Sequence, residues 1–432
     1  MTRSIQLSYG GSVTVVAPPP TSVSVCRLEA SPTLTCVTSA AKTSYPASYD
    51  LVPPPRTDPF RQRGRVAWIV VVAIIGVVGV AGGVYMAMTA EDAKGASLSI
   101  VYAMLPLPLV WFAYWWLDRY EPGPRRYKIA AFVWGGVVAV GIAIALQLWI
   151  SSTWDLTDAE MATFIAPITE EPAKGLFLLA LFLRGRRIID GPLDGLIVAG
   201  LVGVGFAFVE NIGYYAFSYA GADGEIYLDG AEGATATFVV RGVFSPFAHP
   251  LFTSAVGIAV GFAVTRRSWW AKVPIVAAGL AISMGLHLLW NGSLSYGEGV
   301  GFVLVYLALG AVLVIVATIA IIVRLRQVRT LEESLVYVAQ RGWIHPAEIP
   351  YLSRFSHRRA ARRYAAREYG KVAGQVVRRY QQVATEMAFL HDRVMRGQRV
   401  PNGVERTYAL LDQMYALRPG VRLPPALAPY PA

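Results

Sequence analysis

The sequence reads Ala166-Pro167-Ile168-Thr169-Glu170-Glu171-Pro172-Ala173-Lys174-Gly175 inside an apolar run that ends at Leu183. A charged side chain in a membrane helix costs roughly 3 kcal/mol or more on insertion scales, so two carboxylates and an ammonium need partners or a function. Lys174 follows Glu170 by four residues and Glu171 by three, which puts all three on one helix face. On its own, this stretch fits either an ion cluster that packs helices together or a functional site.

The composition of the whole chain is that of a membrane protein. Of its 432 residues, 55% are hydrophobic and 16% are charged, which is too apolar for an ordinary soluble protein. Apolar runs that approach or meet the ~20 residues of a helical span cover residues 66–88, 98–117, 129–150, 161–183, 196–219, 236–265, 273–291 and 300–323. These runs predict an all-α, polytopic membrane helix bundle of about eight transmembrane helices within residues 61–323.

The loops between these runs alternate in charge. One set carries thirteen basic residues: Arg61, Arg63, Arg65, Arg119, Arg125, Arg126, Lys128, Arg184, Arg186, Arg187, Arg266, Arg267 and Lys272. The other set carries one, Lys94, among many acidic residues. Because basic loops stay in the cytoplasm, both termini of this multi-pass protein are expected there.

The regions on either side of the bundle differ in character. Residues 1–60 are rich in Ser, Thr, Pro and Val and are expected to form a disordered tail. Residues 324–432 carry the whole net charge of +11 and are expected to form a basic cytoplasmic helical region with a loose, Pro-rich end. The Thr330-x-x-Glu333 spacing predicts a capped helix start within it. Its basic face fits membrane lipid or a solvated helix hairpin, and no motif indicates nucleic acid.

Three later helices carry polar residues between the midplane of the membrane and its outer surface. The fifth run contains Glu210-Asn211, the sixth contains Arg241, His249 and Thr253, and the seventh contains His287 and Asn291. At 1.5 Å per residue, Glu170 and Glu210 lie about 14 Å below the outer ends of their runs, and His249 and His287 about 13 and 4 residues below theirs. We therefore expect these residues to meet at one water-accessible cavity in the outer half of the bilayer.

These residue types suit peptide hydrolysis. A carboxylate in a low-dielectric site can take a proton from water and pass it to a leaving amine. Imidazole and amide groups can orient water or bind an oxyanion. The roles expected for Lys174 and Arg241 are to neutralise buried carboxylates. Histidines and glutamates are also zinc ligands, so zinc is an alternative, although no His-Glu-x-x-His motif supports it and no cofactor is expected.

Four motifs in this order resemble those of the PrsW family of intramembrane proteases, which is related to the CAAX-prenyl-protease and bacteriocin-processing superfamily. They are Glu170-Glu171-x-x-Lys174, Phe206-x-x-x-Glu210-Asn211, His249-x-x-x-Thr253 and His287, and the Asp118-Arg119-Tyr120-Glu121-Pro122 loop is similar as well. The resemblance covers residues 98–323.

The resemblance implies a role for each residue. Glu170 or Glu171 would activate the hydrolytic water, Glu210 and His249 would complete the catalytic centre, and His287 with Asn291 would polarise the scissile carbonyl. It also implies regulatory cleavage of membrane-anchored protein substrates in a bacterial plasma membrane. A proton-coupled transporter and a non-catalytic scaffold are the alternatives, because membrane carboxylates and histidines also build proton relays.

Overall fold

The computed structural model describes residues 93–119, 123, 125–183, 189–221, 229–297, 299–396, 400 and 402–425, together with four short N-terminal strands. The chain divides into two units, Met1–Val52 and Pro53–Ala432. In the first unit, β1 (Arg3–Gln6) pairs with β2 (Ser12–Val15), and β3 (Ser24–Arg27) pairs with β4 (Thr35–Thr38), both antiparallel. The rest of the predicted tail up to residue 60 and the predicted first span, 66–88, lie outside the described residues.

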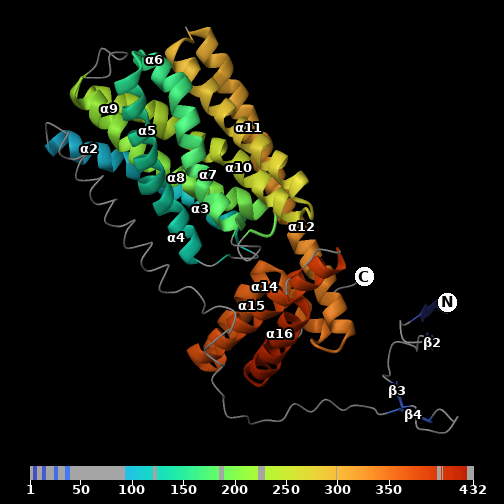
Figure 1. The fold of residues 1–432 in the computed structure, drawn as a ribbon. Coiled ribbons are helices and arrows are strands. Elements are labelled where there is room, and N and C mark those ends of the chain that lie inside the picture. Colours follow the sequence, from blue (N-terminus) through green and yellow to red (C-terminus); the bar gives the residue numbers. More distant parts are fainter. Residues whose placement is uncertain are drawn as a thin grey trace. The chain divides into compact units, whose positions relative to one another are not determined.

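The described part of the second unit is all-helical (Figure 1). Its membrane bundle consists of α2 (Ala93–Met104), α3 (Leu107–Leu117), α4 (Arg125–Val133), η1 (Trp134–Ala139), α5 (Val140–Thr153), α6 (Asp158–Glu160), η2 (Met161–Ile165), α7 (Ala166–Leu183), α8 (Pro192–Tyr219), α9 (Gly230–Phe238), η3 (Val239–Phe244), α10 (Ala248–Thr265), α11 (Trp269–Ser295) and α12 (Val300–Gln340). The segments η1, η2 and η3 are π-helical turns. These helices confirm the predicted all-α, polytopic bundle.

Six helical segments in the described residues are long and apolar enough to cross a membrane. They are Lys94–Leu117, Arg125–Thr153, Pro192–Tyr219, Gly230–Thr265, Trp269–Ser295 and Val300–Gln340. The helix formed by η2 and α7 matches the predicted run 161–183 in length, but it carries Glu170, Glu171 and Lys174. Each predicted run within the described residues therefore coincides with helical structure, although short breaks interrupt the runs 98–117 and 236–265.

Two local signals in the sequence have the structural effect that is typical of them. Thr157 and Glu160 form a reciprocal capping box that starts the helix leading into α7. Pro246 and Pro250 flank His249 in the sixth run, and prolines favour a kink in a helix. The helix breaks there: Ser245 leaves helical geometry, with φ −126° and ψ 36°, and α10 begins at Ala248. The break lies next to His249, at the first turn of α10.

The packing of α8 against α10 fixes the position of His249. A Cβ atom on Gly195 would lie 1.9 Å from the backbone oxygen of Gly257, so the two helices touch through their backbones there. Further along, a Cβ on Gly203 would lie 2.7 Å from the backbone oxygen of His249. Small residues allow this close approach in membrane bundles. The start of α10 is therefore held directly against the middle of α8.

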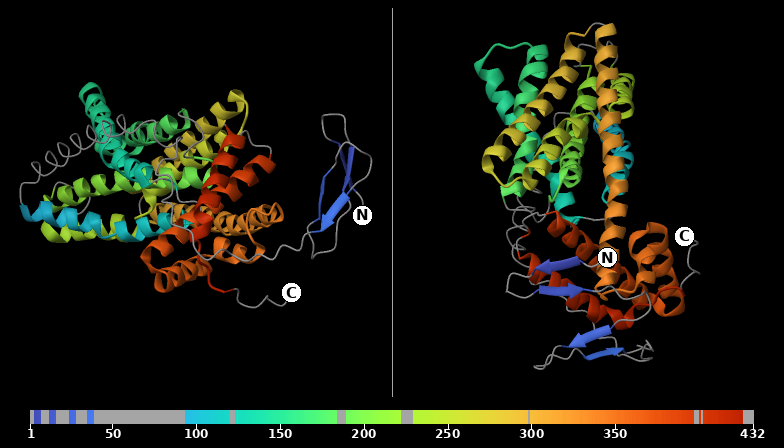
Figure 2. Two further views of the ribbon diagram at one scale, coloured as in Figure 1. Left: turned by 90° about the horizontal axis from the view of Figure 1, so that it is seen from below. Right: turned by 90° about the vertical axis from the view of Figure 1, so that its right-hand side faces the viewer.

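The prediction that a helix starts at Thr330 is wrong. Helix α12 runs without interruption from Val300 to Gln340, as Figure 2 shows. No breaker separates its apolar part from the segment that follows, and Leu331 and Leu335 are buried against the C-terminal helices. The capping spacing was therefore present without a helix terminus.

The C-terminal region is helical, as predicted. It contains η4 (Pro346–Glu348), α13 (Ile349–Ser353), α14 (Phe355–Glu368), α15 (Gly370–Met395), α16 (Gly403–Leu417) and η5 (Arg418–Gly420). The basic stretch turns at Gly370, whose φ of +87° favours glycine. The apolar residues Val372, Val376, Val383, Met387 and Leu390 have the spacing of one amphipathic helix face. Val383, Met387 and Leu390 lie in the core of this region and Val376 packs against it, whereas Val372 is exposed.

Candidate active site

The polar residues of α7 lie in the interior of the bundle. Helices α5, α8, α10 and α11 surround α7 (Figure 1). Glu171 and Lys174 are fully buried, and Glu170 is 5% exposed. Lys174 Nζ donates to Glu171 Oε1 at 2.7 Å and to Glu170 Oε2 at 3.2 Å. The helical spacing predicted from sequence therefore places one ammonium against two carboxylates.

Glu171 accepts hydrogen bonds from four side chains on three helices. Lys174 Nζ and His287 Nδ1, the latter at 2.9 Å, bind Oε1. Ser283 Oγ at 2.7 Å and Thr253 Oγ1 at 3.3 Å bind Oε2. Both oxygens of this carboxylate already accept two hydrogen bonds each. Glu171 therefore acts as an anchor: it holds α7 to α10 and α11 through these bonds.

Glu170 has fewer partners than Glu171. Its Oε1 accepts a hydrogen bond from Gln147 Nε2 at 3.3 Å, and its Oε2 accepts the 3.2 Å bond from Lys174. His287 Nε2 lies 3.9 Å from the same Oε2. These longer contacts leave lone pairs on Glu170 available to a further donor such as water.

A third carboxylate, Glu210 of α8, approaches His249 from the opposite side. Its Oε2 lies 2.5 Å from Arg241 Nη2 and 2.6 Å from His249 Nε2. Arg241 also donates from Nε to Asn211 Oδ1 at 2.7 Å, and its guanidinium lies over the Tyr214 ring. Arg241 and Glu210 thus form an ion pair, as expected for a cation that neutralises a buried carboxylate.

The two histidines complete the cluster. His249 Nδ1 lies 3.2 Å from Lys174 Nζ, and the rings of His249 and His287 are 5.2 Å apart between centroids. His249 is 5% exposed and His287 1%. Both histidines are therefore buried between their helices and bonded to other members of the cluster.

The structure thus brings Glu170, Glu171, Lys174, Glu210, His249 and His287 into one polar cluster, with Thr253, Asn211 and Arg241 bound to its members. Asn291 is placed differently. Its Nδ2 donates to the backbone oxygen of Ala162, at 2.7 Å, within the π-helical turn η2. In this structure it supports the helix that carries the glutamates rather than pointing into the cluster.

Sequence reasoning missed two members of the cluster, Ser283 and Gln147. Ser283 precedes His287 by four residues and therefore shares its helix face. Gln147 is a polar residue within the apolar run 129–150. The helical spacing of Ser283 and the polarity of Gln147 were visible in the sequence. Serine is common in membrane helices, however, and its hydroxyl usually bonds to the backbone of its own helix. Only the tertiary packing shows that Ser283 reaches Glu171 instead.

The donor atoms fit a divalent metal by type. One atom from each of Glu170, Glu171, His249 and His287 lies within 4.8 Å of the others. Four ligands at about 2.1 Å from zinc would lie about 3.4 Å apart, so a small contraction would suffice. Lys174, however, already stands among three of these residues. A dication about 4 Å from its ammonium would be repelled by roughly 8 kcal/mol at an effective dielectric constant of about 20. With Lys174 in this position, the residues do not fit a metal.

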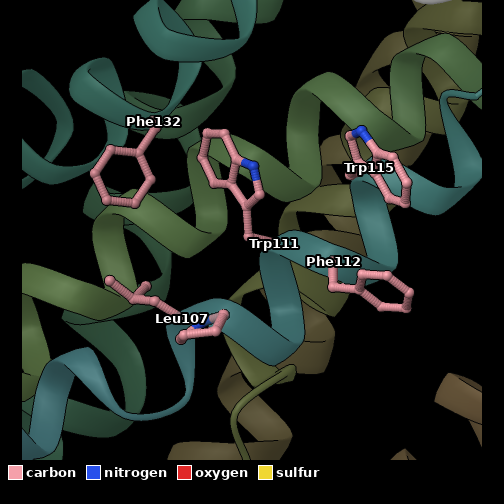
Figure 3. A pocket seen from close by; sticks show the side chains of 6 residues that line it. Leu107, Trp111, Phe112, Trp115 and Phe132 are labelled. Atoms are coloured by element: carbon pink, nitrogen blue, oxygen red, sulfur yellow. The ribbon is translucent and has the colours of Figure 1, made fainter. Parts of the chain in front are cut away.

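A pocket of about 710 Å³ lies elsewhere in the bundle. It is lined by Leu107, Pro108, Trp111, Phe112, Trp115 and Phe132, from α3 and α4 (Figure 3). None of these side chains carries an acid, a base or a metal ligand. The candidate acids and bases therefore lie in the polar cluster and not in this apolar pocket.

Known proteins share the region that contains the cluster. The family described as PrsW family intramembrane metalloprotease matches residues 123–322. The chain is also similar to Protease PrsW of Geobacillus kaustophilus (strain HTA426), with 26% identity over 180 residues that cover 40% of this chain and 73% of the relative. No solved structure matches it. Every residue of the polar cluster falls inside the matched family region. Residues 123–322, which hold the polar cluster, match the PrsW family of intramembrane proteases, and this match together with the curated relative supports a peptidase.

Proposed function

We propose that this protein hydrolyses peptide bonds of membrane-anchored protein substrates with a water molecule activated by Glu170. The supporting observation is the convergence of two glutamates and two histidines from α7, α10 and α11 within 4.8 Å. A peptidase needs its acid, base and positioning groups around one reacting atom. A proton-coupled carrier would instead need polar groups that connect both surfaces.

The assignment of Glu170 as the base rests on the different surroundings of the two glutamates. A general base must have a lone pair free to accept a proton from water. Glu171 accepts from four side chains, whereas Glu170 accepts two longer hydrogen bonds. Glu171 therefore serves as the anchor that holds His287 and Lys174 in place.

Hydrolysis then follows a simple proton path. Glu170 takes a proton from water as the water oxygen bonds to the scissile carbonyl carbon. The product of this attack is a tetrahedral oxyanion. When the carbon–nitrogen bond breaks, Glu170 returns its proton to the leaving amine. His287, whose Nε2 lies 3.9 Å from Glu170, and His249, held by Glu210, orient the water and the substrate.

Substrate access requires the cluster to open. Glu210 and Arg241, with side chains 17% and 11% exposed, are the most accessible charged members. Arg241 lies in the last turn of η3, directly before the helix break at Ser245. A hinge at this break would move the start of α10, which carries His249, away from α7. We infer that the substrate enters along this side of the cluster.

The orientation remains an inference from the basic loops. It places both termini in the cytoplasm and the cluster in the outer half of a plasma membrane, so the expected substrates are single-span proteins cleaved near that surface. Release of such a segment would suit regulatory proteolysis. Membrane lipid is a further expected partner, for the basic C-terminal helices.

The proposal is tested with purified full-length protein in liposomes and a panel of single-span substrates. Mass spectrometry identifies the new termini, and Glu170→Gln is compared with wild type. Glu232→Gln, at an exposed glutamate in the first turn of α9, is the matched control. The proposal requires cleavage by wild type and by the control, and none by Glu170→Gln. Full cleavage by Glu170→Gln would refute it.

A further inference from the structure

The Lys174 ammonium is enclosed on all sides by groups that attract a cation. Glu171 Oε1, Glu170 Oε2 and His249 Nδ1 lie at 2.7, 3.2 and 3.2 Å from Nζ. The face of the Phe206 ring covers it, with Nζ 3.7 Å from the ring centroid. Lys174 is fully buried and Phe206 is 2% exposed. An aromatic face binds ammonium groups through its negative quadrupole, so these four neighbours form a cage for a positive charge.

Hydrogen bonding assigns the tautomer of His249. Glu210 is paired with Arg241 and can only accept, so His249 Nε2 donates to it. The neutral ring then has a lone pair on Nδ1, and this lone pair faces Lys174. Three acceptors around Nζ match the three hydrogens of an ammonium.

His287 is assigned in the same way. Its Nδ1 donates to Glu171, which leaves a lone pair on Nε2, on the side of Glu170. Each histidine is thus oriented by a carboxylate, so that its free lone pair lies toward the centre of the cluster. Carboxylates orient metal-binding histidines in the same manner. In this chain, however, the cation among the donor atoms is Lys174.

We propose that Lys174 is the resident cation of the active site and occupies the place that a divalent metal would take. The side chain stabilises the neighbouring carboxylates, holds His249 through Nδ1 and excludes a metal ion from the cluster. The family description names a metalloprotease, and this chain would then be a member that works without the metal. The catalytic part rests on the proposed function, but the exclusion of metal does not, because metal binding is measured without any substrate.

The test measures metal content in full-length protein purified in detergent. Wild type, Lys174→Met and Lys272→Met are incubated with Zn²⁺ or Co²⁺ and desalted, and the metal per chain is determined by elemental mass spectrometry. Co²⁺ absorption reports the coordination. Lys272, at the start of α11 beside Trp269, is a matched control outside the cluster. We expect less than about 0.1 metal per chain in wild type and the control, and about one in Lys174→Met.

The double variant Lys174→Met/His249→Ala shows where the metal binds. If the metal gained by Lys174→Met is bound by His249, the double variant should contain none. Stoichiometric metal in wild type that His249→Ala removes would overturn the proposal. So would a Lys174→Met variant that melts cooperatively yet binds no metal. If Lys174→Met does not fold, Lys174→Gln replaces it. If neither folds, the metal content of wild type and of His249→Ala decides alone: metal that depends on His249 refutes the proposal, and its absence supports it. Cleavage activity enters none of these outcomes.

Discussion

Lys174 Nζ and Glu171 Oε1 lie 2.7 Å apart, in an ion pair in which neither side chain is exposed. The two residues are three positions apart on α7, so one helical turn suffices to form the pair. Through Glu171 the pair also reaches α10 and α11, because Thr253, Ser283 and His287 bind the same carboxylate. The ion pair therefore organises the helices around the site as well as neutralising their charges.

The two glutamates should respond differently to the same substitution. Glu171→Gln removes the charge that holds Lys174 and disturbs four hydrogen bonds, so we expect a loss of stability of about 3–5 kcal/mol. Glu170→Gln should change stability by less, because Glu170 has fewer and longer contacts. Thermal melting in detergent measures both variants. Equal destabilisation by the two variants would contradict the division into an anchor and a base.

Removal of Lys174 should lower the yield of folded protein as well as activity. Lys174→Ala leaves two buried carboxylates and His249 Nδ1 without their shared donor, which costs about 3–5 kcal/mol. Size-exclusion profiles and melting curves report the folded fraction, with Lys272→Ala as the control. A variant of full stability and no activity would assign Lys174 a direct chemical step instead.

Glu210 should act through His249. Glu210→Gln keeps the shape but no longer fixes Nε2–H on His249, so we expect kcat to fall by about 10²-fold with little change in KM. The pH dependence of kcat should shift as well, because the carboxylate no longer influences the imidazole. If Glu210→Gln only weakened substrate binding, KM would rise and kcat would stay unchanged, which would contradict this role.

The contact between α8 and α10 predicts a strong effect of one methyl group. In Gly195→Ala, the new Cβ would lie 1.9 Å from the Gly257 backbone oxygen, so the helices must separate. We expect a loss of about 1–3 kcal/mol. Gly285→Ala in α11 is the control, because nothing lies within 4 Å of its Cβ position, and there alanine should stabilise the helix by about 0.5–1 kcal/mol. Similar melting temperatures for both variants would refute this packing.

Topology is the prediction on which the proposed side of cleavage depends. Reporter fusions after Arg187 and after Asp229 should report the cytoplasm and the exterior, respectively, because basic residues flank the first loop and acidic residues the second. The reverse result would place the cluster in the cytoplasmic half of the bilayer. The peptide bonds within reach of the cluster would then lie near the cytoplasmic surface instead of the outer one.

The sequence predicted the helices and the main members of the cluster, because apolar length and helical spacing act locally. Glu170, Glu171 and Lys174 meet within about one helical turn. Because charged side chains are costly inside a membrane, their presence in an apolar run implied polar partners on other helices. The destination of a single polar side chain depends on tertiary packing, which spacing does not encode. For that reason Ser283 was missed, Asn291 bonds to Ala162 instead of joining the cluster, and Thr330 caps no helix.

The central claim is that Glu170 activates the hydrolytic water. Its most direct test is the single-turnover cleavage rate of Glu170→Gln relative to wild type in the same liposomes, corrected for the folded fraction. Loss of a general base should lower this rate by about 10²–10⁴-fold, with substrate affinity unchanged and with Glu232→Gln at the wild-type rate. A corrected rate for Glu170→Gln within a factor of two or so of wild type would contradict the claim, since no general base contributes that little.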